Sequence, residues 1–113
     1  MKLSEVENDI LGDMSQDTHG VWELFEFARM HYPSYNDQQI FEIGRDMLKS
    51  WHERQWLRLS DKPLYPTRTE NLEQMFEEID QLGVKATKYY EGAPSIELTD
   101  KTYDAVVWLR RAI

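Results

Sequence analysis

The sequence contains no cysteine, which excludes disulfide bonds and thiolate metal sites. It also has no apolar run approaching the roughly 18 residues that a membrane-spanning helix requires. The first ten residues, MKLSEVENDI, carry charges where a signal peptide would have an apolar segment. These absences predict a cytoplasmic protein without a disulfide framework and without membrane association.

Motifs for catalysis and cofactor binding are also missing. No serine lies in a G-x-S-x-G context, and the five glycines form no phosphate-binding loop. The three histidines, His19, His31 and His52, make neither a His-x-x-x-His pair nor a Glu-x-x-His motif. Carboxylates four residues apart, such as Glu73 and Glu77, share a helix face, but nothing indicates a catalytic cleft around them. The sequence therefore predicts a non-enzymatic protein with no cofactor and no metal ion.

Positive charge is scarce, because 13 lysines and arginines face 21 aspartates and glutamates, for a net charge of −8. Such a charge repels nucleic acid and anionic membranes and attracts a basic partner, although it also serves solubility alone. The length of 113 residues predicts a single domain, residues 1–113, and the 12% of aromatic residues supply large side chains for its core.

The most informative stretch is Asn36–Ser60. Its apolar residues recur at helical spacing, which predicts a long amphipathic helix, at Ile40, Ile43, Met47, Leu48 and Trp51. Leu57 and Leu59 then alternate with polar residues, so the period changes from about 3.6 to 2. Asn36 is a good N-cap for the helix. The pattern predicts a helix that runs directly into a short strand.

Two helices are predicted before this stretch. Ser4 and Glu7 form a capping box, which indicates a helix beginning near Ser4. Gln16–Gly20 is interpreted as a turn, and Val21–Tyr32 as a second helix. Three large side chains lie off the main apolar face of that second helix, so we expect it to be enclosed on several sides: Trp22, Phe27 and Met30.

The C-terminal part alternates helix and strand. Val84–Tyr90 is rich in residues that favour strands, Ser95–Leu98 is predicted as a short strand, and Asp100–Ala112 as the last helix. If Ser95–Leu98 pairs with the strand that follows the long helix, Arg58 and Glu97 share one face of the sheet. The fold class is therefore α+β, with about five helices and a small antiparallel sheet of two or three strands.

The outline of two helices, a strand and a returning strand is partly winged-helix-like. The 30-odd residues between the two strands are too many for an ordinary wing. A winged-helix DNA-binding transcriptional regulator is the alternative function. The long helix would then read DNA through its basic residues, but acidic residues are interleaved with them, and acidic side chains weaken binding to phosphates. The sequence therefore argues against nucleic acid as the partner.

A fourth helix, capped by Thr67 or Thr69 and ending at Gly83, is strongly acidic. No lysine or arginine interrupts its acidic residues, four of which fall along one side: Glu70, Glu73, Glu77 and Asp80. This row is either a solvated face neutralised by bases from elsewhere or a docking surface for a basic protein. Glu5, Asp9 and Asp13 of the first helix are expected to extend it. Trp22 and Trp108 are candidate aromatic anchors of the interface.

Three further segments are informative: VWELFEF (Val21–Phe27), IFEIGRDMLKSWHERQWLRL (Ile40–Leu59) and SIELTDKTYDAVVWLRRA (Ser95–Ala112). They resemble small acidic bacterial proteins of families of unknown function, some of which are immunity proteins of contact-dependent inhibition and related polymorphic toxin systems. The resemblance implies a cytosolic protein that binds a cognate basic toxin, often a nuclease, and covers its active site. It carries no catalytic residues over and says little about architecture. An adaptor or oligomerisation module is a third possibility.

Overall fold

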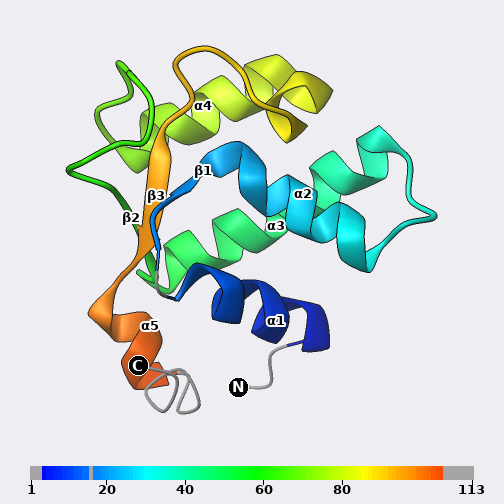
Figure 1. Ribbon diagram of the computed structural model, residues 1–113, viewed down its shortest axis with the longest axis horizontal. Helices are drawn as coiled ribbons and strands as arrows, with labels where there is room; N and C mark the ends of the chain where they lie inside the picture. The colour runs from blue at the N-terminus through cyan, green and yellow to red at the C-terminus, as the bar shows by residue number, and fades with distance from the viewer. Residues whose placement is uncertain (1–3, 16, 106–113) are drawn as a thin grey trace.

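The computed structural model describes residues 4–15 and 17–105, and there the chain has the predicted α+β architecture. Figure 1 labels its elements. In chain order they are α1 (Glu5–Met14), β1 (His19–Gly20), α2 (Val21–His31), α3 (Asp37–Glu53), β2 (Leu57–Leu59), α4 (Leu72–Leu82), the 3₁₀ helix η1 (Gly83–Thr87), β3 (Ser95–Leu98) and α5 (Asp100–Ala105). The prediction of about five helices and a small antiparallel sheet is confirmed.

The sheet has the order β1-β3-β2, and both pairings are antiparallel. Arg58 lies directly opposite Glu97, which is the predicted register. The prediction of a simple turn at residues 16–20 was incomplete, because His19 and Gly20 pair with Ile96 and Ser95. A strand of two residues is too short to show any alternation of apolar and polar side chains, so sequence periodicity could not reveal it.

Side-chain caps fix where the helices begin. Asn36 accepts a hydrogen bond from the backbone N–H of Gln39 at 2.9 Å, as expected for the N-cap of α3. The prediction that Thr67 or Thr69 caps α4 was wrong. Asn71 is the N-cap, and its side chain accepts from the backbone N–H of Gln74 at 2.8 Å.

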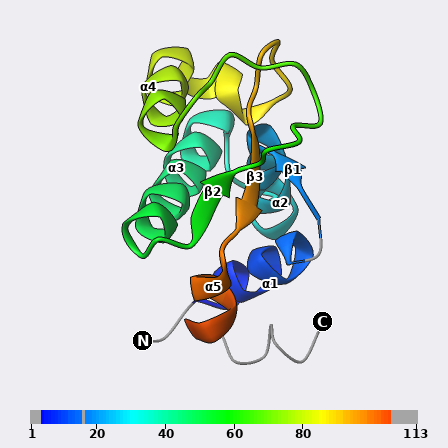
Figure 2. The ribbon, with the colours of Figure 1, turned by 90° about the vertical axis from the view of Figure 1, so that its left-hand side faces the viewer.

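The core forms around α3, which lies beside α2 and leads into the sheet (Figures 1 and 2). Gln55, just after α3, has a positive φ of 63°, and this bend lets β2 start two residues later. Helix α2, the 3₁₀ helix η1 and strand β2 contact α3, and buried side chains of α1, α4 and β3 belong to the same core. The largest side chains that are fully enclosed there include Trp51, Phe25, Ile10, Met75 and Ile96.

The segment after α4 was predicted to be β-prone but forms the 3₁₀ helix η1. Gly83 ends α4 with a positive φ of 59°, a conformation that glycine adopts without strain. Ala86 and Thr87 are fully buried. Arg29 of α2 donates to the Thr87 carbonyl at 2.8 Å and to its hydroxyl at 2.6 Å. Tertiary contacts therefore override the local strand preference.

The expectation that α2 is enclosed on several sides holds for two of its three off-face residues. Trp22 and Phe27 are half-buried, whereas Met30 is 77% exposed. The predicted last helix reaches Ala105, and its continuation to residue 112, including Trp108, lies outside the described residues. Across the described parts of the chain, no helix has the length and apolar character needed to span a membrane.

Candidate functional site

The acidic residues predicted as a docking row are exposed. Glu73, Glu77 and Asp80 lie on one side of α4, at spacings of four and three residues. Glu70 is also exposed, but it precedes α4 by two residues and is therefore not on the helix. Glu78 belongs to the same acidic run yet lies on another side of α4, where it lines a pocket. The row thus consists of three helical carboxylates and one that precedes them.

Neighbouring bases compensate this row only in part. Lys49 of α3 lies 3.7 Å from the Asp80 carboxylate, and His52 lies 3.8 Å from Glu73, an attraction that requires the imidazole to be protonated. Within residues 4–15 and 17–105, Glu70 and Glu77 form no ion pair. The interpretation of a face neutralised by bases from elsewhere therefore fits Asp80 but not the whole row.

The long helix α3 adds acidic residues next to this row. Helical spacing places Glu42, Asp46 and Glu53 on the side of α3 that carries Lys49, and all three are exposed. Arg45 is half-buried, lies over the Phe41 ring at 5.2 Å, and contacts Asp46 at 3.7 Å. Six exposed carboxylates thus form what we name the α3–α4 acidic surface: Glu42, Asp46, Glu53, Glu73, Glu77 and Asp80.

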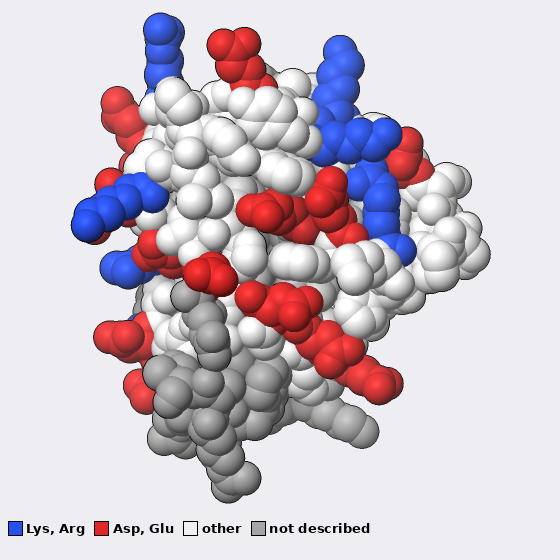
Figure 3. All heavy atoms as spheres, in the orientation of Figure 1, with Lys and Arg blue, Asp and Glu red and all other residues white. Residues whose placement is uncertain are grey.

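The acidic residues of α1 do not extend this surface. α1 and α4 lie at opposite ends of the molecule (Figures 1 and 2). Figure 3 shows a separate band of acidic side chains across the face where α1 and α2 lie. The exposed acidic residues of these two helices are Glu5, Asp9, Asp13 and Glu26. The expectation that α1 continues the α4 row was therefore wrong.

Of the two predicted aromatic anchors, Trp22 lies within the described residues, and it belongs to α2 rather than to α3 or α4. Trp22 is half-buried and packs edge-on against Tyr89, with ring centroids 5.9 Å apart. Tyr89 is 53% exposed and also contacts Tyr65, at 5.2 Å between centroids. Trp108 lies outside the described residues. Tyr89 and Tyr65, rather than Trp22, are the exposed aromatic members of this cluster.

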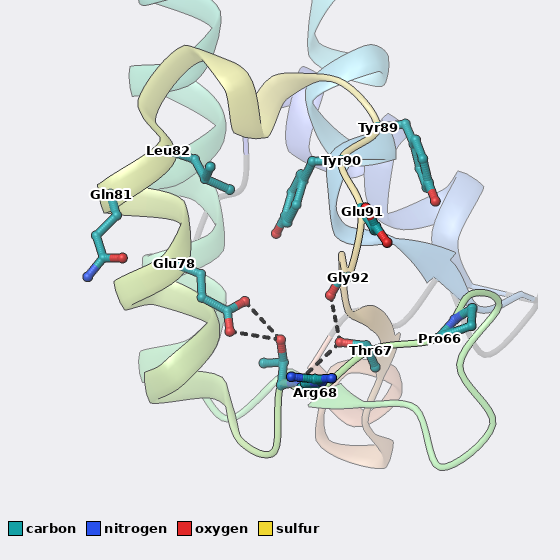
Figure 4. A pocket seen from close by; sticks show the side chains of 11 residues that line it. Pro66, Thr67, Arg68, Glu78, Gln81, Leu82, Tyr89, Tyr90, Glu91 and Gly92 are labelled. Carbon is teal, nitrogen blue, oxygen red and sulfur yellow. Dashed lines mark hydrogen bonds between the residues drawn. The ribbon is translucent and has the colours of Figure 1, made fainter.

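Tyr89 also lines a cavity of about 1160 Å³ that sequence reasoning did not predict. Three segments form it: residues 66–69, the part of α4 that carries Glu78 and Leu82, and residues 89–92. Figure 4 shows the Glu78 carboxylate and the Tyr90 hydroxyl directed toward the same space, with Tyr89 next to Tyr90 on the side away from Glu78. The carboxylate and the two phenol rings therefore border one cavity.

Polar groups in this pocket have spare hydrogen-bonding capacity. Both oxygens of the Glu78 carboxylate accept from the Thr69 hydroxyl, at 3.1 and 2.8 Å. The Tyr90 hydroxyl is buried and has no hydrogen-bond partner among the described residues. Burial raises the pKa of Tyr90 above its ordinary value, and the nearby Glu78 carboxylate raises this pKa further. Tyr90 therefore stays a neutral phenol at physiological pH.

Residues 4–15 and 17–105 contain no group of three or more His, Asp or Glu side chains that could hold a metal ion. Comparison with known proteins gives no further assignment. No family model, curated protein or solved structure matches the chain. The candidate site therefore rests on the α3–α4 acidic surface and the adjoining pocket. Sequence spacing could find the acidic residues of α4, but neither their position beside those of α3 nor the pocket, because these segments meet only after folding.

Proposed function

We propose that this chain is a non-enzymatic binding protein that docks a basic protein through the α3–α4 acidic surface. Its resemblance to immunity proteins gives the class of partner: a cognate basic toxin, nuclease-type, which it neutralises in the cytoplasm by covering the active site. The observation that carries the proposal is the exposure of six carboxylates on two adjacent helices. On α3, Asp37–Glu53, the permanently charged basic residues are Arg45 and Lys49, and each is already paired with an aspartate.

A basic partner would be attracted by the electrostatic field of carboxylates that no neighbouring base neutralises. Carboxylates such as Glu77, which have no ion pair within the described residues, attract a cationic surface over roughly 8 Å at physiological ionic strength. Complementary charge raises the association rate and disfavours partners of the same sign. The net charge of −8 adds to this field. A strongly basic nuclease domain has the complementary charge.

Matched charge reversals on two surfaces test the proposal. The double variant Glu73→Lys with Glu77→Lys alters the α3–α4 acidic surface, and Asp9→Lys with Asp13→Lys makes the same change on α1. The partner is a basic toxin domain, which the proposal predicts to be encoded next to this gene, and its binding is measured at several salt concentrations. We expect the α4 variant to weaken binding by about tenfold or more, mainly through a slower association rate, with a smaller salt dependence. The α1 variant should lose much less.

Equal losses in both variants would mean that net charge alone drives binding, and unchanged binding by the α4 variant would overturn the assigned surface. Circular dichroism of both variants checks that they are folded. Growth of cells that express the toxin domain, with each variant supplied in turn, tests the neutralising role separately from affinity.

The alternative is a winged-helix-like transcriptional regulator, favoured by the helix pair that leads into an antiparallel sheet. In that function α3 would enter the major groove. Its outward side carries Glu42, Asp46 and Glu53, and Lys49 already contacts Asp80. These acidic side chains would face DNA phosphates, so we place this function second. It predicts duplex binding in a gel shift at low salt that is lost in the Arg45→Ala, Lys49→Ala variant.

A further inference from the structure

We propose that the pocket between residues 66–69, α4 and residues 89–92 binds a guanidinium group, presented by an arginine side chain of the basic partner. This inference rests on the proposed function for the source of the arginine. The chemistry of the pocket itself is argued from its own residues, in particular Glu78, Tyr89 and Tyr90.

The pocket offers acceptors that nothing in the described chain saturates. A carboxylate has about four lone-pair sites, and the Thr69 hydroxyl can donate only one hydrogen to Glu78. The buried Tyr90 oxygen has no partner among the described residues. A buried polar atom without a partner costs free energy, so a ligand that supplies donors here recovers that loss. The unmet requirement is for hydrogen-bond donors beside a negative charge.

A guanidinium group satisfies this requirement better than other common groups. It has five N–H donors in a flat fork and no acceptor, so it can donate to Glu78 and to Tyr90 together. Its flat faces also bind aromatic rings, which Tyr89 and Tyr90 provide at the pocket wall. An ammonium group is more strongly hydrated and does not present a planar fork. The cavity of about 1160 Å³ admits an arginine side chain together with its adjoining backbone.

An anionic ligand is the competing occupant, because Arg68 also lines the pocket. Arg68 is exposed, whereas Glu78 is half-buried. The Glu91 carboxylate lines the pocket as well, so its charged groups sum to a negative total. A carboxylate or phosphate would approach Arg68 against two negative charges. The balance of charge therefore favours a cation.

The test uses N-acetyl-arginine amide as the probe, and N-acetyl-citrulline amide as a neutral probe of nearly the same shape. Titrations are followed through the backbone amide signals of the ¹⁵N-labelled full chain. We expect saturable shifts at Thr69, Tyr90 and Gly92, with the citrulline probe about tenfold weaker because it lacks the charge. Glu78→Gln should weaken binding of the arginine probe by about tenfold, and Tyr90→Phe by a few-fold. Thermal unfolding of each variant shows that it is folded.

The control is Glu26→Gln, which removes one charge from the exposed side of α2, outside the pocket. An equal loss in Glu26→Gln and Glu78→Gln would mean that only the overall field attracts the probe, and would overturn the inference. So would shifts at the same amides caused by inorganic phosphate, or equal binding of the two probes. If arginine binding fails while the Glu73→Lys, Glu77→Lys variant still loses the toxin domain, only this inference falls. If arginine binds and that variant is unaffected, the proposed function falls and the pocket remains a guanidinium site.

Discussion

Arg58 and Glu97 form an ion pair across β2 and β3, with 2.7 Å between the guanidinium Nη2 and the carboxylate Oε2. The same carboxylate accepts hydrogen bonds from Thr18 at 2.6 Å and from Ser60 at 2.7 Å, both through its Oε1 atom. Thr18 directly precedes β1, and Ser60 directly follows β2. One side chain in the central strand therefore connects both outer strands of the sheet.

The stability of the protein should depend on the ionisation of Glu97. The hydrogen bonds from Thr18 and Ser60, with a smaller effect of Arg58, hold the pKa of Glu97 below its ordinary value of 4.5. A lowered pKa in the folded state means that the ionised group stabilises the fold above pH 4.5, and that this contribution is lost as the pH falls through the lower, folded value. We expect Glu97→Gln to be less stable than the natural chain by about 1–2 kcal/mol at pH 7.

Urea unfolding at pH 7, 5 and 3 measures this difference, which should shrink as the pH falls below 4.5. Arg58→Gln provides a comparison. Because the Arg58 side chain is 60% exposed, its loss should cost less than the loss of Glu97. A difference between Glu97→Gln and the natural chain that is the same at all three pH values would contradict the role given to the ionised carboxylate.

Gly44 of α3 packs closely against Phe25 of α2. A Cβ atom at this position would lie 2.5 Å from Cδ1 and 2.6 Å from Cε1 of Phe25, a ring with no exposed surface. We expect Gly44→Ala to destabilise the fold by about 1–3 kcal/mol, even though alanine favours helix, because the ring has no free space to enter. Thermal unfolding measures this loss. Adding Phe25→Leu should cost less in the Gly44→Ala chain than in the natural one, and an additive result would argue against the clash.

Glu7 links the start of α1 to the middle of the core. One of its carboxylate oxygens lies 3.4 Å from the backbone N of Ser4 in the capping box, and the other accepts from the Trp51 indole N–H at 2.9 Å. Glu7→Ala leaves that indole unpaired in a fully buried side chain, so we expect a loss of about 1–3 kcal/mol in the free energy of unfolding. Glu5→Ala is the control, because Glu5 is exposed and lies two residues before Glu7 in the same helix. It should change the free energy of unfolding little. Urea titration followed by tryptophan fluorescence gives both values.

Asn71 should matter for α4 in a way that depends on its side-chain acceptor. Asn71→Ala removes the bond to the Gln74 N–H and should cost about 1 kcal/mol, whereas Asn71→Ser keeps an acceptor and should cost a few tenths. The melting temperatures of the two variants provide the measurement. An alanine variant as stable as the serine variant would show that the cap does not stabilise α4.

Sequence pattern predicted those elements whose signals are local. The helical period and the Asn36 cap locate α3, and the alternation of Leu57 and Leu59 predicts β2 with its pairing to β3. The strand preference of Val84–Tyr90 was misleading, because burial of Ala86 and Thr87 against α2 and α3 decides the conformation of this segment. Thr69 was misassigned as a cap because its hydroxyl binds Glu78, nine residues further along the chain.

In the candidate site, too, sequence pattern predicted the local features but not those that depend on tertiary packing. Spacing along the sequence placed Glu73, Glu77 and Asp80 on one side of α4, because helix geometry is fixed once the helix is known, but it wrongly included Glu70, which precedes the helix. Spacing left the exposure of this row open. Spacing could not place α1 at the far end of the molecule, which depends on how the helices pack. Nor could it show that Tyr90 and Glu78 meet across a cavity, since they belong to separate segments.

The outer strands of the sheet are very short: β1 has two residues and β2 has three. An exposed edge strand can pair with a strand of another molecule through its unpaired backbone N–H and C=O groups. Edge strands this short provide few such groups. Repulsion between copies that each carry a charge of −8 acts in the same direction. Concentrated solutions of this protein should therefore resist amyloid-like aggregation.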